Sequence, residues 1–172
     1  MKVNIIEKEV LNPLGDTDTK KINLKPLNPN INVICYLDNT KPNADVILKT
    51  IQREIASPKS FKIIKPAGAP ASNRDILRAC KSDMVILAVG DCGSCSTWVI
   101  LDAIKLERMG IPTISICSRQ FSDYARMLAK SYGAPDLRIF DIEHPVAELD
   151  EEEIKLKVKS IIIKIKKLLE GN

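Results

Sequence analysis

At the middle of the chain stands the run Met84-Val85-Ile86-Leu87-Ala88-Val89-Gly90-Asp91-Cys92-Gly93-Ser94-Cys95. Its apolar residues predict a buried strand, the glycine after them predicts a tight turn, and a helical pattern begins just beyond. A Cys-x-x-Cys pair therefore lies where a strand passes into a helix. A helix that starts near Ser94 directs its unpaired N–H groups and its positive dipole end at the Cys92 sulfur, and both favour the reactive thiolate.

The cysteine pair also fits two roles without redox chemistry: small buried apolar residues, or half of a four-ligand zinc site. A four-ligand zinc site would require a second pair of cysteines at similar spacing, and the sequence does not contain one. The chain has five cysteines, Cys35, Cys80, Cys92, Cys95 and Cys117. An odd set spread along apolar segments is typical of catalytic or buried thiols in a reducing compartment rather than of a disulfide scaffold. We therefore expect a cytoplasmic protein with a redox or nucleophilic cysteine pair and no bound metal.

Length and composition fit one globular domain. The chain has 172 residues, of which 45% are hydrophobic and 28% charged, enough for a full hydrophobic core. No run approaches the roughly 20 apolar residues of a membrane-spanning helix, and the start of the chain lacks the apolar region of a signal peptide. A net charge of only +4 with 4% aromatic residues argues against nucleic acid as a partner. We also expect no membrane association.

Strands and helices alternate on both sides of the cysteine turn. We expect strands at residues 31–37, 61–64, 84–89, 111–117 and 137–142, and helices at residues 45–55, 72–80, 94–109, 121–132 and from 150 onward. Residues 1–30 contain Asn-Pro and Lys-Pro breaks and predict an extended arm, which packs on a single α/β domain at 31–172.

The C-terminal segment begins with three glutamates and then repeats apolar residues at spacings of three and four, with lysines between them. This pattern predicts an amphipathic helix whose lysines form a solvated face. A role of that face at a membrane surface or a partner protein stays as the alternative.

Five strands separated by helices predict a three-layer α/β fold, a parallel sheet with helices on both faces. We expect the flavodoxin-like strand order 2-1-3-4-5. In this order the carboxyl ends of the first and third strands meet at the point where ligands bind in such sheets. The loop at 38–43 then faces the cysteine turn, and the ends of the fourth and fifth strands bring Cys117 and His144 nearby.

The expected site centres on Cys92 as the attacking thiolate and Cys95, one helical turn away, as the resolving thiol. Nine further residues are candidates for binding substrate or supporting the thiols: Asp38, Asn39, Lys41, Asn43, Asp91, Ser94, Thr97, Cys117 and His144. Several of them also have an ordinary structural role that competes with the functional one.

On the loop, Lys41 fits two roles. It is either a cation that stabilises the thiolate or binds an anionic substrate, or it is an ordinary solvent-exposed lysine. Asn43 fits a helix cap as well as a ligand contact. Ser94 and Thr97 can donate hydrogen bonds to the thiolate, although Ser94 also fits an N-cap and Thr97 fits helix packing.

Near the other strand ends, Asp91 adjoins Cys92 and would raise the pKa of that thiol unless its carboxylate points away. Cys117 fits a core residue better than a third redox thiol. His144 is the only histidine, and hence the sole imidazole for proton transfer, with a turn residue before proline as the alternative.

Several of these segments together resemble the UGSC family, which is named for a selenocysteine-Gly-Ser-Cys motif. The resemblance rests on Leu37-Asp38-Asn39-Thr40-Lys41-Pro42-Asn43-Ala44, Asp91-Cys92-Gly93-Ser94-Cys95, Asp102-Ala103-Ile104 and Gly110-Ile111-Pro112-Thr113. It extends from residue 11 to residue 145. It implies a selenol- or thiol-dependent redox protein, distantly similar around the turn to selenoprotein subunits of glycine and proline reductases. Here Cys92 stands where some members carry selenocysteine.

The leading hypothesis is thus an oxidoreductase whose dithiol acts on a small, anionic substrate and is restored by an external reductant. No cofactor is expected, because the two glycines of the turn lack the spacing of a nucleotide-binding loop. Two alternatives remain: a non-redox enzyme with Cys92 as covalent nucleophile, and a module that binds a small molecule or a metal without chemistry. A homo-oligomer is left open.

Overall fold

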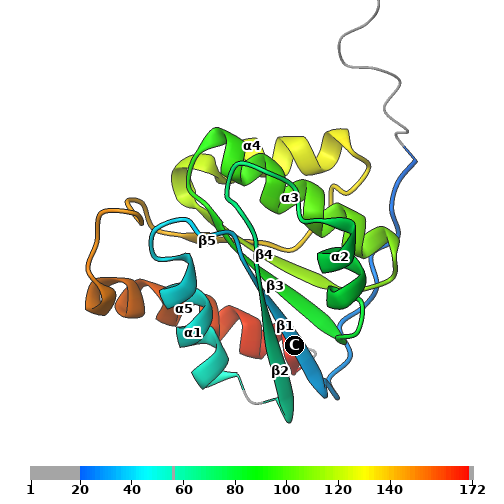
Figure 1. Cartoon of the computed structure of the whole chain (residues 1–172), viewed down its shortest axis with the longest axis horizontal. Coiled ribbons are helices and arrows are strands. Elements are labelled where there is room, and N and C mark those ends of the chain that lie inside the picture. The colour runs from blue at the N-terminus through cyan, green and yellow to red at the C-terminus, as the bar shows by residue number, and fades with distance from the viewer. Residues whose placement is uncertain (1–19, 56, 171–172) are drawn as a thin grey trace, which may run out of the picture.

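The computed structural model describes residues 20–55 and 57–170, which form a parallel sheet between two layers of helices (Figure 1). The elements in chain order are β1 (Val33–Asp38), α1 (Ala44–Glu54), β2 (Lys59–Ile64), α2 (Asn73–Ala79), β3 (Met84–Gly90), α3 (Gly93–Arg108), β4 (Thr113–Ser118), α4 (Arg119–Ser131), β5 (Ile139–Ile142) and α5 (Glu151–Leu169). The strand order is β2-β1-β3-β4-β5, and each neighbouring pair is parallel. The expected flavodoxin-like order is confirmed, and the expected element boundaries lie within two residues of the observed ones.

The helices divide into two layers (Figure 1). Helices α1 and α5 pack together on one face of the sheet, and α2, α3 and α4 cover the other. The central strand β3 is buried at every position because both of its faces are covered. This explains why its sequence is a continuous apolar run rather than an alternating one.

The ends of the long helices follow local chemistry. Helix α5 begins with a capping box: the Asp150 carboxylate accepts from the Glu153 N–H at 2.9 Å, and the Glu153 carboxylate accepts from the Asp150 N–H at 3.1 Å. Gly110 and Gly133 follow α3 and α4 with φ of 83° and 81°, the left-handed conformation that glycine adopts without strain. The predicted stops of both helices are confirmed.

The N-terminal arm expected at 1–30 lies outside the described residues for positions 1–19. Residues 20–32 contain no helix or strand. The Ile22 N–H donates to the Gly133 carbonyl at 2.7 Å. Ile22 and Leu24 contact the hydrophobic cluster on the α3 side of the sheet, and Leu27 and Ile31 contact the cluster on the α1 side. The described part of the arm therefore buries apolar side chains on both sides of the sheet.

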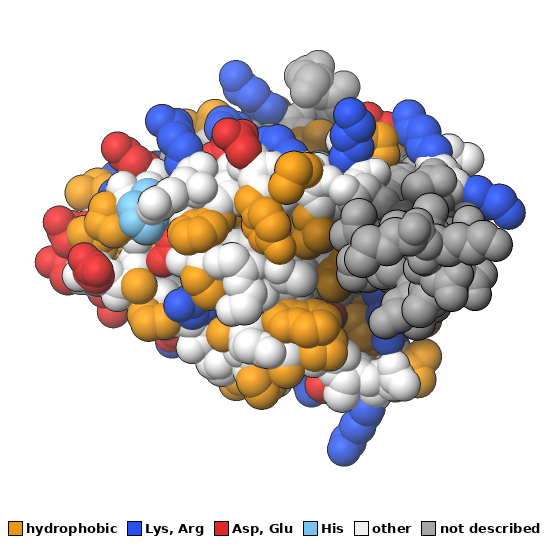
Figure 2. All heavy atoms as spheres, turned by 90° about the horizontal axis from the view of Figure 1, so that it is seen from above, with side chains coloured by type: hydrophobic (Ala, Val, Ile, Leu, Met, Phe, Trp, Pro, Cys, Tyr) orange, Lys and Arg blue, Asp and Glu red, His pale blue; other side chains and the backbone are white. Residues whose placement is uncertain are grey.

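The surface carries mixed side chains. Figure 2 shows hydrophobic groups scattered across the face seen from above, with acidic side chains gathered at one end. That end is where the loop after β5 and the start of α5 lie in Figure 1, and three glutamates form the first turn of α5, where the helix dipole favours anions. Within the described ranges, no helix is both long enough and apolar enough to pass through a bilayer.

Candidate functional site

The two cysteines of the motif lie at the carboxyl end of β3, at the start of α3. Their sulfur atoms share a hydrogen bond of 2.6 Å. The Cys92 sulfur also accepts from the Cys95 N–H at 3.3 Å, so Cys92 itself is the N-cap of α3. Ser94 therefore does not fill the N-cap role that its residue type suggests; the helix starts one residue earlier because the Cys92 sulfur takes the acceptor role. The two side chains face each other, a small movement away from the roughly 2.05 Å of a disulfide bond.

The two thiols differ in exposure and acidity. Cys92 is partly exposed, whereas Cys95 is fully buried. Partial burial acts to raise the pKa of Cys92, but hydrogen bonds from the Cys95 thiol and amide outweigh it and bring the pKa below its ordinary value, helped by Ser94 and Lys41. Burial, followed by the hydrogen bond to Cys92, raises the pKa of Cys95 to about 11. The accessible sulfur is therefore the one that ionises first.

Two polar neighbours stabilise the Cys92 thiolate. The Ser94 hydroxyl lies 3.6 Å from the Cys92 sulfur, where it can donate to a thiolate. Lys41, partly exposed on the loop after β1, lowers the pKa of both thiols through its charge. Within residues 20–55 and 57–170 its ammonium forms no ion pair or hydrogen bond, so no carboxylate at contact distance neutralises this charge.

Asn39 joins the loop to the turn. Its side chain is fully buried and binds both polar groups of one residue: its amide donates to the Val89 carbonyl at 2.8 Å, and its carbonyl accepts from the Val89 N–H at 2.9 Å. The Asn39 N–H donates to the Ala88 carbonyl at 3.0 Å. These bonds extend the pairing of β1 with β3 past the end of the ladder. They fix the Lys41 loop beside the cysteine turn, as the strand order predicts.

Asp38 and Asn43 shape this loop but bond away from the sulfurs. Asp38 accepts from the Thr40 N–H at 2.8 Å and pairs with Lys62 at 3.3 Å. Asn43 has a left-handed φ of 66° and makes no side-chain cap. Its amide instead donates to two carbonyls of the loop after β5, those of Val146 and Leu149, at 2.8 and 2.9 Å. Asn43 thus occupies the N-cap position of α1, as one of its two predicted roles requires, but its side chain ties two loops together and does not cap the helix.

Asp91 and His144 form the third side of the site. The Asp91 carboxylate, whose side chain is only 5% exposed, lies 3.2 Å from the His144 Nδ1. It is thus directed to the imidazole, and the pKa of Cys92 stays lowered. The imidazole packs edge-on against Phe121, with ring centroids 6.5 Å apart, and the His144–Pro145 peptide is cis. The expectation that His144 reaches the cysteine turn is confirmed by its contact with the residue before Cys92.

A profile of the UGSC family matches residues 9–171, nearly the whole chain. The chain belongs to the UGSC family. No curated protein matches it. In this UGSC protein the Cys-Gly-Ser-Cys stretch runs from Cys92 to Cys95, and its two cysteines contact each other at the end of the central strand.

Thr97 lies one turn further along α3 in this UGSC protein, and its hydroxyl forms hydrogen bonds to groups other than the two thiols. It donates to the Gly93 carbonyl at 2.9 Å, so the Tyr124 hydroxyl, 2.6 Å away, donates to it. No proton is left for the thiolate, and helix packing is the role that this geometry favours. Sequence reasoning does not single out Tyr124, because its contact joins two helices and only the packing of α3 against α4 creates it.

Cys117 lies behind the turn as a core residue. It is fully buried, and burial raises its pKa to about 12. Gly90 leaves room for it: a Cβ at this position would lie 2.7 Å from the Cys117 sulfur and 2.8 Å from the Ser96 hydroxyl. The close packing of these three residues explains why the strand has to end in glycine.

Metal binding is one of the alternatives that the sequence leaves for the cysteine pair. In the part of the chain that the structure describes, no three His, Cys, Asp or Glu side chains converge in a way that would hold an ion. The residues that do converge on the Cys92 sulfur are a second thiol, a hydroxyl and a lysine charge.

Proposed function

We propose that this UGSC protein is a thiol-dependent oxidoreductase whose Cys92 and Cys95 cycle between dithiol and disulfide. The observation that carries the proposal is the pair itself: two sulfur atoms 2.6 Å apart, of which the partly exposed one has a lowered pKa and the buried one a pKa raised to about 11. An attacking thiol has to be ionised and reachable, and a resolving thiol has to stay protonated until the first bond has formed.

The proposed reaction transfers two electrons to an oxidised substrate that carries a breakable bond between an electrophilic atom and a leaving group. The Cys92 thiolate attacks that atom, a covalent bond to Cys92 forms, and the leaving group departs with the electrons of the old bond. Cys95 then attacks the Cys92 sulfur, the disulfide forms, and the second part of the substrate leaves with the bonding pair and the proton from Cys95. An external dithiol reductant returns the protein to its starting state.

Lys41 supports the choice of a small, anionic substrate. Its ammonium lies beside the turn, acts on both thiols, and has no ion-pair partner among the described residues. The start of α3 adds a positive dipole end at the same place. We propose that the two positive centres attract an anionic group of the substrate and hold its electrophilic atom against Cys92.

The proposal is tested with glutathione disulfide as the probe. In the reduced wild-type protein, the mixed disulfide at Cys92 should be resolved by Cys95, so that the protein loses two hydrogens and carries no glutathione. In Cys95→Ser the glutathione should stay attached to Cys92, as mass spectrometry of the intact protein and its peptides shows. Cys80→Ser, which removes another partly exposed thiol, should behave as the wild type. Wild-type protein that retains glutathione, or a Cys95→Ser variant that never acquires it, contradicts the proposal.

A second function, covalent catalysis without redox change, is favoured by one observation. The Asp91–His144 pair, with its 3.2 Å contact, places an oriented imidazole at the same turn, and such pairs serve acid–base steps next to a nucleophilic thiol. This function needs Cys92 and His144 but not Cys95. Once a substrate is known, full turnover by Cys95→Ser would select it over the dithiol cycle.

A further inference from the structure

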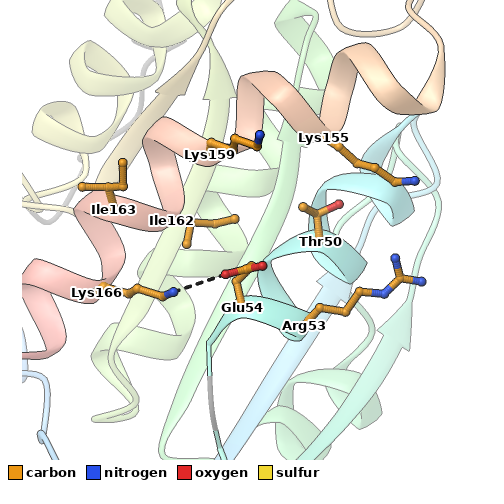
Figure 3. A pocket seen from close by; sticks show the side chains of 8 residues that line it. All are labelled: Thr50, Arg53, Glu54, Lys155, Lys159, Ile162, Ile163 and Lys166. Atoms are coloured by element: carbon orange, nitrogen blue, oxygen red, sulfur yellow. Dashed lines mark hydrogen bonds and ion pairs between the residues drawn. The ribbon is translucent and has the colours of Figure 1, made fainter.

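A groove runs along the face of the molecule opposite α3, between the two helices of the other layer. Its cavity volume is about 460 Å³, within the range of roughly 300–1,000 Å³ that is usual for small-molecule sites. Figure 3 shows its lining: Thr50, Arg53 and Glu54 from α1, and Lys155, Lys159, Ile162, Ile163 and Lys166 from α5. None of these residues belongs to the cysteine site.

The α5 wall of the groove offers two neighbouring isoleucines. Ile162 is 5% exposed and also belongs to the core, whereas Ile163 is 56% exposed. A large aliphatic side chain left in water gains free energy when a ligand covers it. The groove therefore presents an apolar surface to which an aliphatic or aromatic body can bind.

The charges around this apolar surface are mostly positive. Of the four cations that line the groove, Lys166 pairs with Glu54 at 3.3 Å, and Lys155 pairs with Glu151 and Glu152 at 2.9 and 2.7 Å. Arg53 and Lys159 have no ion pair or hydrogen bond among residues 20–55 and 57–170. The charge of Arg53 reaches Glu151 only at longer range, as one of the weaker contributions to the lowered pKa of that carboxyl.

Arg53 and Lys159 stand on opposite walls of the groove, one on α1 and one on α5 (Figure 3). The single lining carboxylate, Glu54, is already bound to Lys166. An anion between the walls would compensate both free charges, and a guanidinium binds carboxylate and phosphate oxygens through two parallel hydrogen bonds. The charges thus favour an anionic head, and the isoleucines favour an apolar body.

We propose that the groove between α1 and α5 binds a small amphiphilic anion, an aliphatic or aromatic body on Ile162 and Ile163 with an anionic head between Arg53 and Lys159. This site is separate from the cysteine turn and does not depend on the function proposed for it. The ligand class is defined by the groove: one negative head group joined to an apolar body that fits about 460 Å³.

The test titrates the reduced full-length protein with octanoate and follows the backbone amides by two-dimensional NMR. Saturable shifts should appear at Thr50, Arg53 and Ile163 and stay absent at the cysteine turn. Octan-1-ol, which lacks the charge, and acetate, which lacks the body, should each bind at least about fivefold more weakly, as expected for the loss of one modest contribution. Octyl phosphate distinguishes a preference for phosphate from one for carboxylate, and either preference supports the site.

Variants locate the head group. Arg53→Met and Lys159→Met keep the apolar stem and should each weaken octanoate binding about five- to tenfold. Lys164→Met removes the same charge from an exposed position of α5 outside the groove and should change the affinity less than about twofold. Three results would overturn the proposal. Lys164→Met could weaken octanoate binding as much as the groove variants do, octan-1-ol could bind as tightly as octanoate, or the amide shifts could fail to saturate. Cys92→Ser should bind octanoate as the wild type does, which keeps this test independent of the redox chemistry.

Discussion

Alkylation of the reduced protein at pH 7 should modify Cys92 much faster than the other cysteines of the described chain. A thiol with a pKa of about 12, as for Cys117, or about 11, as for Cys95, is ionised to about one part in 10⁵ or 10⁴ at this pH. Cys92, whose pKa lies below its ordinary value of 9.0, is more than about 1% thiolate. Ionisation alone therefore favours Cys92 at least about 100-fold over Cys95 and about 1,000-fold over Cys117.

Nucleophilicity reduces this advantage, because a thiolate of lower pKa is intrinsically less reactive. With a Brønsted coefficient of about 0.5, the ratio falls to roughly its square root: about 10-fold over Cys95 and about 30-fold over Cys117. Burial of the two slower thiols adds to both ratios. These values are lower bounds, since the pKa of Cys92 lies below its ordinary value.

Cys80 supplies the control for accessibility. It is partly exposed like Cys92, but burial raises its pKa, so the two differ chiefly in acidity. Short pulses of iodoacetamide between about pH 5 and 9, read by mass spectrometry of the peptides, give the rate at each thiol. The rate at Cys92 should rise with pH and level off above its pKa, whereas that at Cys80 should still be rising there. Equal rates or coinciding pH profiles would refute the assignment of Cys92 as the acidic thiol.

Three further outcomes follow from the packing around the turn. Gly90→Ala places a methyl group 2.7 Å from a buried sulfur and should lower the free energy of unfolding by about 1–3 kcal/mol in urea titrations, whereas Gly93→Ala, with open space around it, should change it little. Asn39→Ala leaves a buried N–H and a buried carbonyl without partners and should cost about 2–6 kcal/mol; an unchanged midpoint would contradict the role given to this side chain. Lys41→Met should move the pH midpoint of Cys92 alkylation upward, because the charge of Lys41 helps to lower the pKa of that thiol, while the melting temperature stays unchanged.

Local sequence was sufficient for the framework of this UGSC protein. A continuous apolar run at 84–89 predicts a strand covered on both faces, and strands separated by helices predict a parallel sheet. Parallel strands end at a common edge, so the cysteine turn after β3 and the loop after β1 had to meet once the strand order was fixed. The caps and stops were equally local, since a capping box or a left-handed glycine uses only neighbours in the chain.

Individual partners at the site were not predictable in the same way. A serine, threonine or asparagine in the sequence indicates a hydrogen-bond donor or acceptor, but it does not indicate the partner of that hydrogen bond. Thr97 bonds Tyr124 and Asn43 bonds the loop after β5, partners 27 and more than 100 positions away along the chain. Such choices depend on how elements pack, because hydrogen bonds act only over a few ångströms.

By itself the sequence determined that Cys92 and Cys95 lie on one turn at the start of a helix, and the helix dipole favoured Cys92 as the thiolate. Only the tertiary structure decided how far the pKa values of the two thiols differ. The packed layers bury Cys95 and leave Cys92 partly exposed, and desolvation raises the pKa of the buried thiol to about 11. The same holds for α5: its periodicity predicts an apolar stripe, but the packing of α1 beside it determines where the groove with its two cations, Arg53 and Lys159, lies. Burial and proximity between distant elements are properties of the folded chain, and they set the pKa values and the charges on which function depends.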